Sequence, residues 1–220
     1  MAKIQNLCSK NIMKNIKIKI CGQTNPAIIE HCLNMGVDQQ GLIFYEKSPR
    51  NLEYETLQII NQYFHSYKNK FVGVFVNPTM KDIEEKLNIF DFDTIQLHGN
   101  ENQDDINEIK DYFKKDIYKS ISPKNFRDTN LKNVTRFLIE GDPSINDQPG
   151  GNNKTWNWND FMNPKKLPFI LSGGLNQDNL SQAIDLTGAN FVDINSGVEE
   201  IKGEKNLSLI DSLISSLKNE

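Results

Sequence analysis

Chemically reactive side chains in this sequence stand where short apolar runs end. Cys21 closes the first such run and is followed by a glycine. His98 follows a later run, and two acids, Glu140 and Asp142, follow another. A thiol of lowered pKa can act as a general base or nucleophile, and a carboxyl group can act as a general acid. These residue types are therefore the ones that acid–base catalysis requires.

Each of these side chains also has a structural interpretation. A cysteine is often buried as a small hydrophobic residue, which suits Cys21. His98 could be an imidazole that is hydrogen-bonded within the fold, and Glu140 and Asp142 could be solvated loop charges. Arg50, in a loop, is either solvated or a clamp for a carboxylate, for which its planar fork is suited. Residue type alone leaves both interpretations open.

Two glycine turns follow the last two apolar runs of the chain. One contains Gly173 and Gly174, and the other contains Ser196 and Gly197. Such turns expose backbone N–H groups, which suit a phosphate dianion, although either turn alone could simply be tight. The occurrence of both favours a phosphate site. Because no nucleotide-type glycine fingerprint is present, the sequence predicts a sugar phosphate as the ligand.

The elements that must position these residues form a repeating pattern. Eight strand-like runs occur at residues 17–21, 41–44, 71–76, 93–97, 116–120, 135–139, 168–171 and 190–194. Helical patterns follow at 26–35, 52–64, 81–88, 102–113, 177–186 and 207–217, with Thr79 as an expected N-cap and Gly36 as an expected C-terminal glycine. A polar loop, 141–155, weakens the sixth helix.

Repeated strand–helix units indicate a parallel sheet covered by helices. Eight units in about 200 residues predict an α/β fold, a single-domain (β/α)8 TIM barrel over residues 16–220 after a polar leader at 1–15. A doubly wound open sheet is the alternative. In a barrel the strands end at one face, so we expect the reactive side chains to meet there.

Composition excludes several other classes of protein. Lys and Arg number 25 against 29 Asp and Glu, a net charge of −4, which does not fit a general nucleic-acid binder. We find no apolar run of membrane-spanning length and no secretory signal, and Met1 or Met13 could be the start. Three cysteines without metal-ligand spacing indicate a reducing compartment, so we expect a cytoplasmic protein without a metal site.

Seven motifs at strand ends, in order along residues 19–205, resemble those of phosphoribosylanthranilate isomerase, an enzyme of tryptophan biosynthesis. They are Lys19-Ile-Cys-Gly22, Phe44-Tyr-Glu-Lys-Ser-Pro-Arg50, Val72-Gly-Val-Phe-Val-Asn77, Gln96-Leu-His-Gly99, Gly150-Gly…Lys154-Thr-Trp-Asn-Trp158, Leu171-Ser-Gly-Gly-Leu-Asn176 and Asp193-Ile-Asn-Ser-Gly-Val-Glu199. Each motif is weak alone, but seven in the right order are a strong signal.

The resemblance implies an Amadori rearrangement of a phosphorylated small molecule, N-(5'-phosphoribosyl)anthranilate, without a cofactor or metal. It makes Cys21 the general base and Arg50 the residue that holds the anthranilate. We also expect Gln96, His98 and Asp193 to bind the substrate. The implied enzyme is a monomer or a homodimer.

The general acid is where this sequence departs from the family. Relatives carry an aspartate at the end of the sixth strand, and an ungapped count places Glu140 there, with Asp142 as the alternative. An unperturbed glutamate is ionised at neutral pH. Glu140 must therefore be shielded, or be charged in the free enzyme and receive its proton with the substrate. Gln23, Glu46 and Asn195 are further departures.

Two other functions fit the pattern less well. Another sugar-phosphate enzyme on the same fold, such as indole-glycerol-phosphate synthase, would want a catalytic lysine at a strand end, and Lys19 lies inside the first strand. A non-catalytic barrel that only binds a sugar phosphate is the other alternative. A turnover assay separates the two, because a binder would saturate without converting the substrate.

Overall fold

The computed structural model describes residues 16–141 and 155–218. Eight parallel strands close into one barrel in which β8 pairs with β1. The strands are β1 (Lys17–Cys21), β2 (Gln39–Phe44), β3 (Phe71–Phe75), β4 (Thr94–Leu97), β5 (Asp116–Ile121), β6 (Arg136–Ile139), β7 (Phe169–Leu171) and β8 (Phe191–Ile194). The predicted barrel is thus confirmed and the open sheet is excluded. The predicted leader and Asp142 lie outside the described residues.

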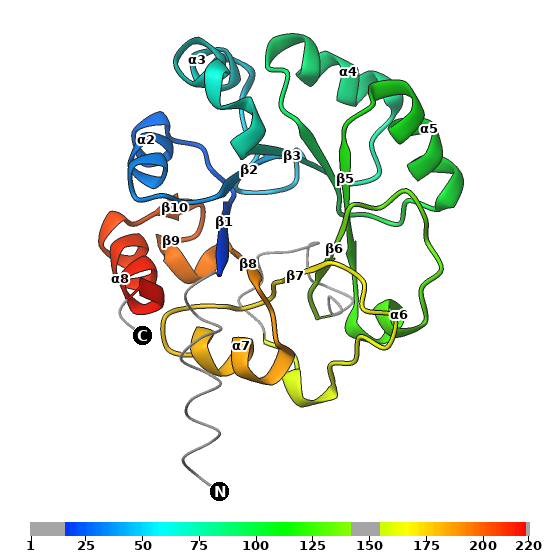
Figure 1. Ribbon diagram of the computed structural model, residues 1–220. Coiled ribbons are helices and arrows are strands. Elements are labelled where there is room, and N and C mark those ends of the chain that lie inside the picture. The colour runs from blue at the N-terminus through cyan, green and yellow to red at the C-terminus, as the bar shows by residue number, and fades with distance from the viewer. Residues whose placement is uncertain (1–15, 142–154, 219–220) are drawn as a thin grey trace, which may run out of the picture.

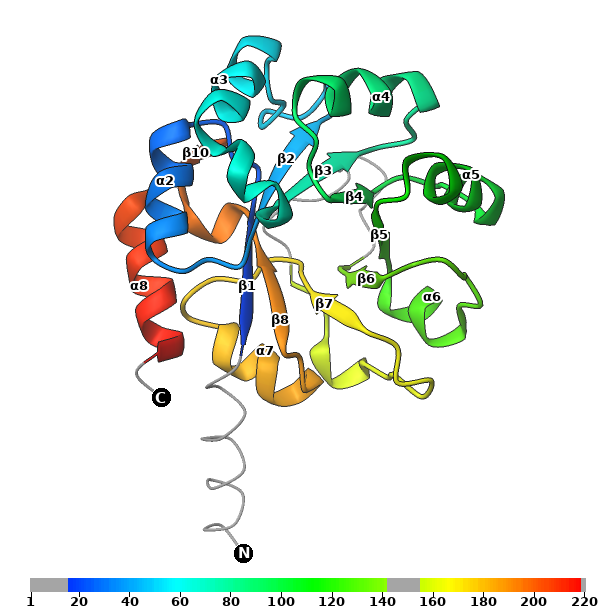
Figure 2. The same ribbon diagram turned by 45° about the horizontal axis from the view of Figure 1, so that its top comes forward.

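Helices surround the barrel on its outer side, as Figure 1 shows in a view along the strands and Figure 2 in a tilted view. They are α2 (Pro26–Asn34), α3 (Tyr54–Phe64), α4 (Met80–Ile89), α5 (Gln103–Phe113), α6 (Pro123–Asp128), α7 (Leu180–Thr187) and α8 (Leu207–Lys218). Short 3-10 turns are η2 (His65–Lys70), η3 (Trp158–Asp160) and η4 (Ser196–Val198). Of the described residues after β6, only η3 is helical before β7, in line with the weak sixth helix.

Local chemistry explains where several elements begin and end. Thr79 is the N-cap of α4, as predicted, because its hydroxyl accepts the N–H of Asp82 while Asp82 accepts the N–H of Thr79. Gly36 follows α2 with a φ of +82°, the conformation that a C-terminal glycine supplies. The predicted helix at 177–186 begins later, at Leu180, since Asn176 to Asn179 form a turn.

The predicted ranges omit α6, the 3-10 turns and one further feature among the described residues. After β8 and η4 the chain forms a small antiparallel hairpin of β9 (Glu199–Ile201) and β10 (Glu204–Lys205) before α8. Its strands are too short and too polar to show a β pattern. The hairpin matters because it brings two charged side chains back to the barrel, as described below.

The strand register decides which side chains share a level inside the barrel. Side chains alternate between the two faces of a strand, so Lys19 and Cys21 of β1 share the inner face. Lys19 is paired in register with Asp193 of β8, and Cys21 with Gly41 of β2. The interior is otherwise mainly apolar, with residues such as Val74 around it. A lysine and an aspartate are therefore enclosed at the same level, one step below the cysteine.

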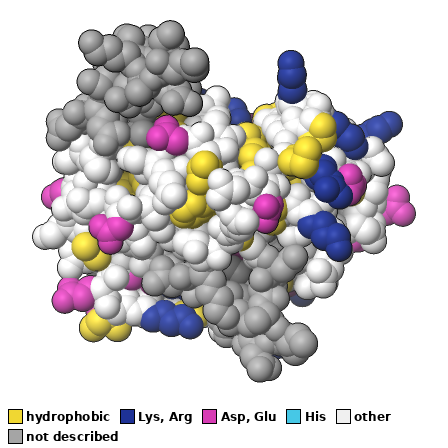
Figure 3. Space-filling model, turned by 90° about the horizontal axis from the view of Figure 1, so that it is seen from below, with side chains coloured by type: hydrophobic (Ala, Val, Ile, Leu, Met, Phe, Trp, Pro, Cys, Tyr) yellow, Lys and Arg dark blue, Asp and Glu magenta, His cyan; other side chains and the backbone are white. Residues whose placement is uncertain are grey.

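The outside of the molecule carries mixed side chains. Figure 3 shows scattered apolar groups among charged groups of both signs on the face that it draws. Within residues 16–141 and 155–218, no helix has the length and apolar character needed to cross a membrane.

Candidate active site

Cys21 lies at the end of β1, inside the barrel, and only 4% of its surface is exposed. Burial raises the pKa of its thiol, and the nearby positive charge of Lys19 acts in the opposite direction. The net pKa lies above the ordinary value. With the charge of Lys19 already counted, the thiol form predominates near neutral pH, and only the thiolate fraction can act as a base.

Lys19 and Asp193 form a buried ion pair beneath this cysteine. The Nζ atom of Lys19 lies 3.0 Å from each carboxylate oxygen of Asp193. Burial lowers the pKa of Lys19, but Asp193 and Cys21 outweigh it and the net pKa is raised. Burial raises the pKa of Asp193, and Lys19 offsets only part of that rise. Asp193, expected to bind substrate, is thus already engaged by a cation.

Glu140 lies at the end of β6 and faces an imidazole. Its Oε1 lies 2.5 Å from Nε2 of His98, and the Ser120 hydroxyl lies 3.4 Å from the same oxygen. Nδ1 of His98 is in turn 3.0 Å from Nε2 of Gln96. His98 and Ser120 therefore contact the carboxylate directly, and Gln96 orients the imidazole. Glu140 and His98 both line a cavity of about 430 Å³ at the strand ends.

The charge state of Glu140 follows from these contacts. Burial alone would raise the pKa of its carboxyl, but His98 and Ser120 lower it, and the net pKa lies below the ordinary value. Glu140 is therefore ionised in the free protein. The sequence analysis expects Glu140 either to be shielded or to be charged in the free enzyme and receive its proton with the substrate. The low pKa agrees with the second expectation.

Arg50 is buried, with 3% of its surface exposed, which excludes the solvated interpretation. Its Nε and Nη2 atoms donate to the two carboxylate oxygens of Glu199 at 2.7 and 2.6 Å. The Nζ atom of Lys205 donates to Glu199 at 2.7 Å and to the side chain of Asn195 at 2.7 Å. The β9–β10 hairpin thus fixes the arginine and the chain just before the second glycine turn.

Arg50 lies directly over the turn that follows Cys21. A Cβ atom added at Gly22 would come 2.7 Å from Cδ of Arg50, and Gly22 has a φ of +75°. Both facts require glycine at this position. The arginine that was expected to hold anthranilate and the cysteine that was expected to be the base are therefore neighbours.

The two glycine turns after β7 and β8 meet each other. Gly173 and Gly174 have φ values of +95° and +66°, which glycine adopts without strain. A Cβ atom on Gly197 would come 1.9 Å from the carbonyl oxygen of Leu175, so glycine is needed there for close approach. Among the residues that the structure describes, no hydrogen bond engages the N–H groups of Gly173, Gly174, Ser196 or Gly197. These donors could bind an anion.

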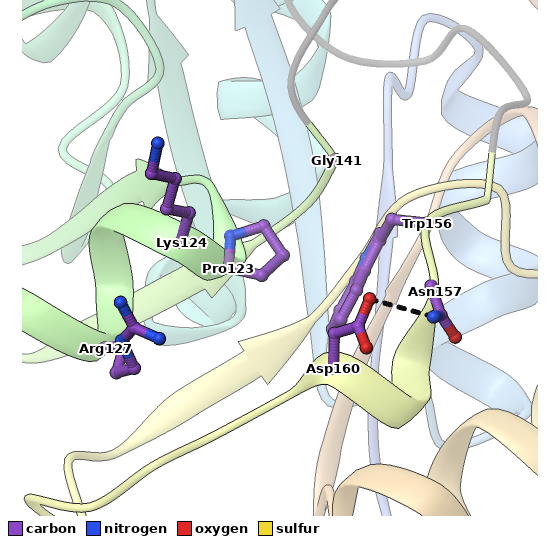
Figure 4. Close-up of a pocket in the computed structure, with 7 residues that line it drawn as sticks. All are labelled: Pro123, Lys124, Arg127, Gly141, Trp156, Asn157 and Asp160. Atoms are coloured by element: carbon purple, nitrogen blue, oxygen red, sulfur yellow. Dashed lines mark hydrogen bonds between the residues drawn. The ribbon is translucent and has the colours of Figure 1, made fainter.

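A separate hollow of about 330 Å³ lies beside the barrel mouth (Figure 4). Lys124 and Arg127 of α6 line one side of it, and Asp160 lines the other. Trp156 also lines it, and the indole Nε1 donates to the carbonyl of Ser172 at 3.0 Å. The tryptophan therefore stands between this hollow and the turn after β7.

Sequence reasoning missed several members of the site. Lys19 was considered only as a lysine for another enzyme, and Glu199 and Lys205 were given no role. Ser120 carried no motif. A charged residue within an apolar strand is the one signal that could have singled out Lys19, because such a residue is rarely buried without a partner.

Comparison with known proteins agrees with this geometry. Residues 18–216 match the family model described as N-(5'-phosphoribosyl)anthranilate (PRA) isomerase. An N-(5'-phosphoribosyl)anthranilate isomerase of Rhizobium rhizogenes is 35% identical over 207 residues, which cover 90% of this chain and 91% of that relative.

Solved structures give the same result. Phosphoribosyl anthranilate isomerase from Thermotoga maritima is 28% identical, with a TM-score of 0.77, over 93% of this chain and 100% of that one. Another phosphoribosyl anthranilate isomerase was solved in complex with reduced 1-(o-carboxyphenylamino)-1-deoxyribulose 5-phosphate. It is 26% identical, with a TM-score of 0.72, and the match covers 93% of this chain and 100% of that one.

The buried Glu199 makes stability depend on acidity. Burial opposes ionisation of Glu199, but Arg50 and Lys205 lower its pKa from 4.5 to about 2. The ionised group therefore adds stability above about pH 4.5, and this contribution disappears as the pH falls from about 4.5 to 2. Urea unfolding at a series of pH values should show the stability gap between wild type and Glu199→Gln narrowing by about 3 kcal/mol over that range.

The matched control is Glu200→Gln, which changes an exposed glutamate on the same strand. Its stability gap to wild type should stay nearly constant with pH. A gap for Glu199→Gln that also stays constant would show that Arg50 and Lys205 do not hold this carboxylate in its charged form.

Proposed function

The chain belongs to the N-(5'-phosphoribosyl)anthranilate isomerase family and is an enzyme with that activity in tryptophan biosynthesis, and we propose that Cys21 is its general base and Glu140 its general acid. The observation that carries this assignment is the placement of the two groups. A thiol beside a buried ammonium and a carboxylate beside an imidazole both stand at the C-terminal ends of barrel strands, where barrel enzymes hold their active sites.

The reaction needs two proton transfers. The acid gives a proton to the furanose ring oxygen while the bond from this oxygen to the anomeric carbon breaks, and the nitrogen lone pair forms a Schiff base. The base then removes the proton from the adjacent sugar carbon, and that electron pair forms the enolamine, which tautomerises to the ketone. Glu140 performs the first transfer and Cys21 the second.

Glu140 must become protonated before it can act. Its pKa is low in the free protein, but the substrate carries a carboxylate and a phosphate. Negative charge brought next to a carboxylate favours the protonated form and raises its pKa. Substrate binding therefore helps to convert Glu140 into a proton donor, while His98 holds its carboxyl group in place.

The remaining substrate groups have partners on neighbouring loops. Arg50 holds the anthranilate carboxylate, and Glu199 fixes the guanidinium orientation. The phosphate binds the N–H groups of Gly173, Gly174, Ser196 and Gly197, the position after β7 and β8 where barrels often bind phosphate. His98 reaches the substrate from the cavity that it lines, whereas Gln96 and Asp193 are enclosed and contribute from beneath.

Further expectations from the sequence accompany this proposal. A cytoplasmic location, a monomeric or homodimeric state, and catalysis without a cofactor or metal stay predictions for this chain. The division of the chain into a polar leader at 1–15 and a single barrel domain at 16–220 is likewise a proposal.

Replacing the proposed base should remove catalysis without unfolding the barrel. Cys21→Ala is expected to lower kcat with N-(5'-phosphoribosyl)anthranilate by about 10²–10⁴-fold, the contribution typical of a positioned base. Cys32→Ala is the control, because Cys32 is also buried but lies on α2 outside the barrel. Cys8→Ala should also leave turnover intact. A Cys21→Ala enzyme with near wild-type kcat would remove this residue from the mechanism.

Replacing the proposed acid should separate turnover from binding. Glu140→Gln keeps the shape but cannot donate a carboxyl proton, so kcat should fall by about 10²–10⁴-fold while KM changes little. Asp142→Asn, measured in parallel, should be mild. If Asp142→Asn is the inactive enzyme and Glu140→Gln the active one, the acid has been assigned to the wrong residue.

Separating the two glycine turns should weaken phosphate binding. Gly197→Ala places a methyl group against the Leu175 carbonyl and must push the turns apart. Inhibition by inorganic phosphate should weaken about tenfold or more, since a hydrogen bond to a charged group is worth about 1.5–3 kcal/mol. Gly188→Ala is the control, because Gly188 is the C-cap of α7 at a φ of +66°, where alanine is strained but has open space around it. Unchanged inhibition in folded Gly197→Ala would contradict the assignment.

A further inference from the structure

Lys19 is a charged side chain for which the reaction steps above provide no role. It is fully enclosed inside the barrel, yet it belongs to the same inner face of β1 as Cys21. Its ammonium group donates two hydrogen bonds to Asp193 and lies close to the Cys21 sulfur, since both groups come within 3.1 Å of a Cβ atom built on Gly41. A lysine that only fastened β1 to β8 would need the aspartate but not the sulfur.

The neighbouring strand leaves room for this contact. A Cβ atom at Gly41 of β2 would come 2.6 Å from Sγ of Cys21 and 3.1 Å from Nζ of Lys19. The Cys21 sulfur and the Lys19 ammonium group therefore both lie next to Gly41. Gly41 has no positive φ that would require glycine, so the need for a small residue here comes from Lys19 and from the side chain and backbone of Cys21.

The charges around Cys21 come from three elements. Lys19 lies on its own strand, Asp193 on β8 and Lys205 on β10. Lys205 also pairs with Glu199. Burial lowers the pKa of Lys205 to about 8, although Glu199 acts in the opposite direction. Lys19 is the largest of the electrostatic influences on the cysteine, and Asp193 acts against it.

We propose that Lys19 is a positioning residue that stabilises the thiolate form of Cys21, the form that takes the proton from the sugar carbon. In that step the carbon–hydrogen bond breaks, its electron pair forms the enolamine double bond, and the proton forms an S–H bond on Cys21. Lys19 stays protonated throughout and transfers nothing. The catalytic meaning of this role rests on the proposed function, since it assumes that Cys21 is the base.

The thiolate of Cys21 can be titrated directly by its ultraviolet absorbance, as the difference from the same protein carrying Cys21→Ala. Lys19→Met removes the cation, so the titration midpoint should rise by about one pH unit or more. Near neutral pH the thiolate fraction and kcat should then both fall about tenfold, with little change in KM. Asp193→Asn removes the opposing anion and should move the midpoint in the other direction.

The matched control is Lys119→Met. Lys119 is also a buried lysine in an ion pair, with Glu101 at 2.9 Å, but it belongs to β5 and does not contact Cys21. The Lys119→Met variant should lower the stability of the protein and leave the titration midpoint of the Cys21 thiol unchanged. A general disturbance of the barrel would move the midpoint in both lysine variants.

A further variant guards against misfolding. Lys19→Met leaves Asp193 buried without its partner, so the double variant Lys19→Met with Asp193→Asn removes both charges together. Its midpoint should still lie above that of Asp193→Asn alone. The proposal is wrong if Cys21 titrates at the same midpoint in folded Lys19→Met as in wild type. It is equally wrong if the folded double variant shows the same Cys21 midpoint as Asp193→Asn alone. If the midpoint moves but Cys21→Ala retains turnover, Lys19 does control the thiol and it is the assignment of the base that fails.

Discussion

Closure of the barrel between β1 and β8 is the constraint on which the site depends. This pairing places Lys19 opposite Asp193, two residues that lie far apart in sequence. Removing two charges from water is costly, and losing one partner of such a buried pair costs about 3–5 kcal/mol. Because the attraction within the pair does little more than offset the cost of removing both charges from water, a buried pair is in itself weak evidence for added stability. Its value here lies in what it positions, because the ammonium that binds Asp193 also lies close to the Cys21 sulfur.

The fold could be predicted because its signals are local. Each strand is a short apolar run, each helix has its own period and caps, and repetition of these units limits the architecture to few choices. The candidate residues could be placed at one end for the same reason, since the chain leaves every barrel strand at the same face. Cys21 and Glu140 therefore lie at the expected strand ends without any knowledge of their contacts.

The electrostatic partners could not be predicted, because they are set by long-range contacts. Arg50 and Glu199 meet only when the hairpin after β8 folds back over the turn after β1. A polar hairpin of a few residues leaves no periodic signal. Lys19 shows the same limit, since a lysine within an apolar strand does not reveal which acid will enclose it. Distances between such residues come from topology and register, which sequence patterns specify only indirectly.

Glu140 stands where the family resemblance predicts an aspartate. The physical question is whether its longer side chain still places the carboxyl group correctly. The extra methylene adds a rotatable bond, and a misplacement of about one ångström can cost ~100-fold in rate. In this chain the longer side chain extends from β6 to His98 on β4 and to Ser120 on β5. These two contacts restrict the freedom that the added bond gives to the carboxylate. Those contacts also favour its charged form, so an acid at this position has to gain its proton as an anionic substrate binds, as proposed above.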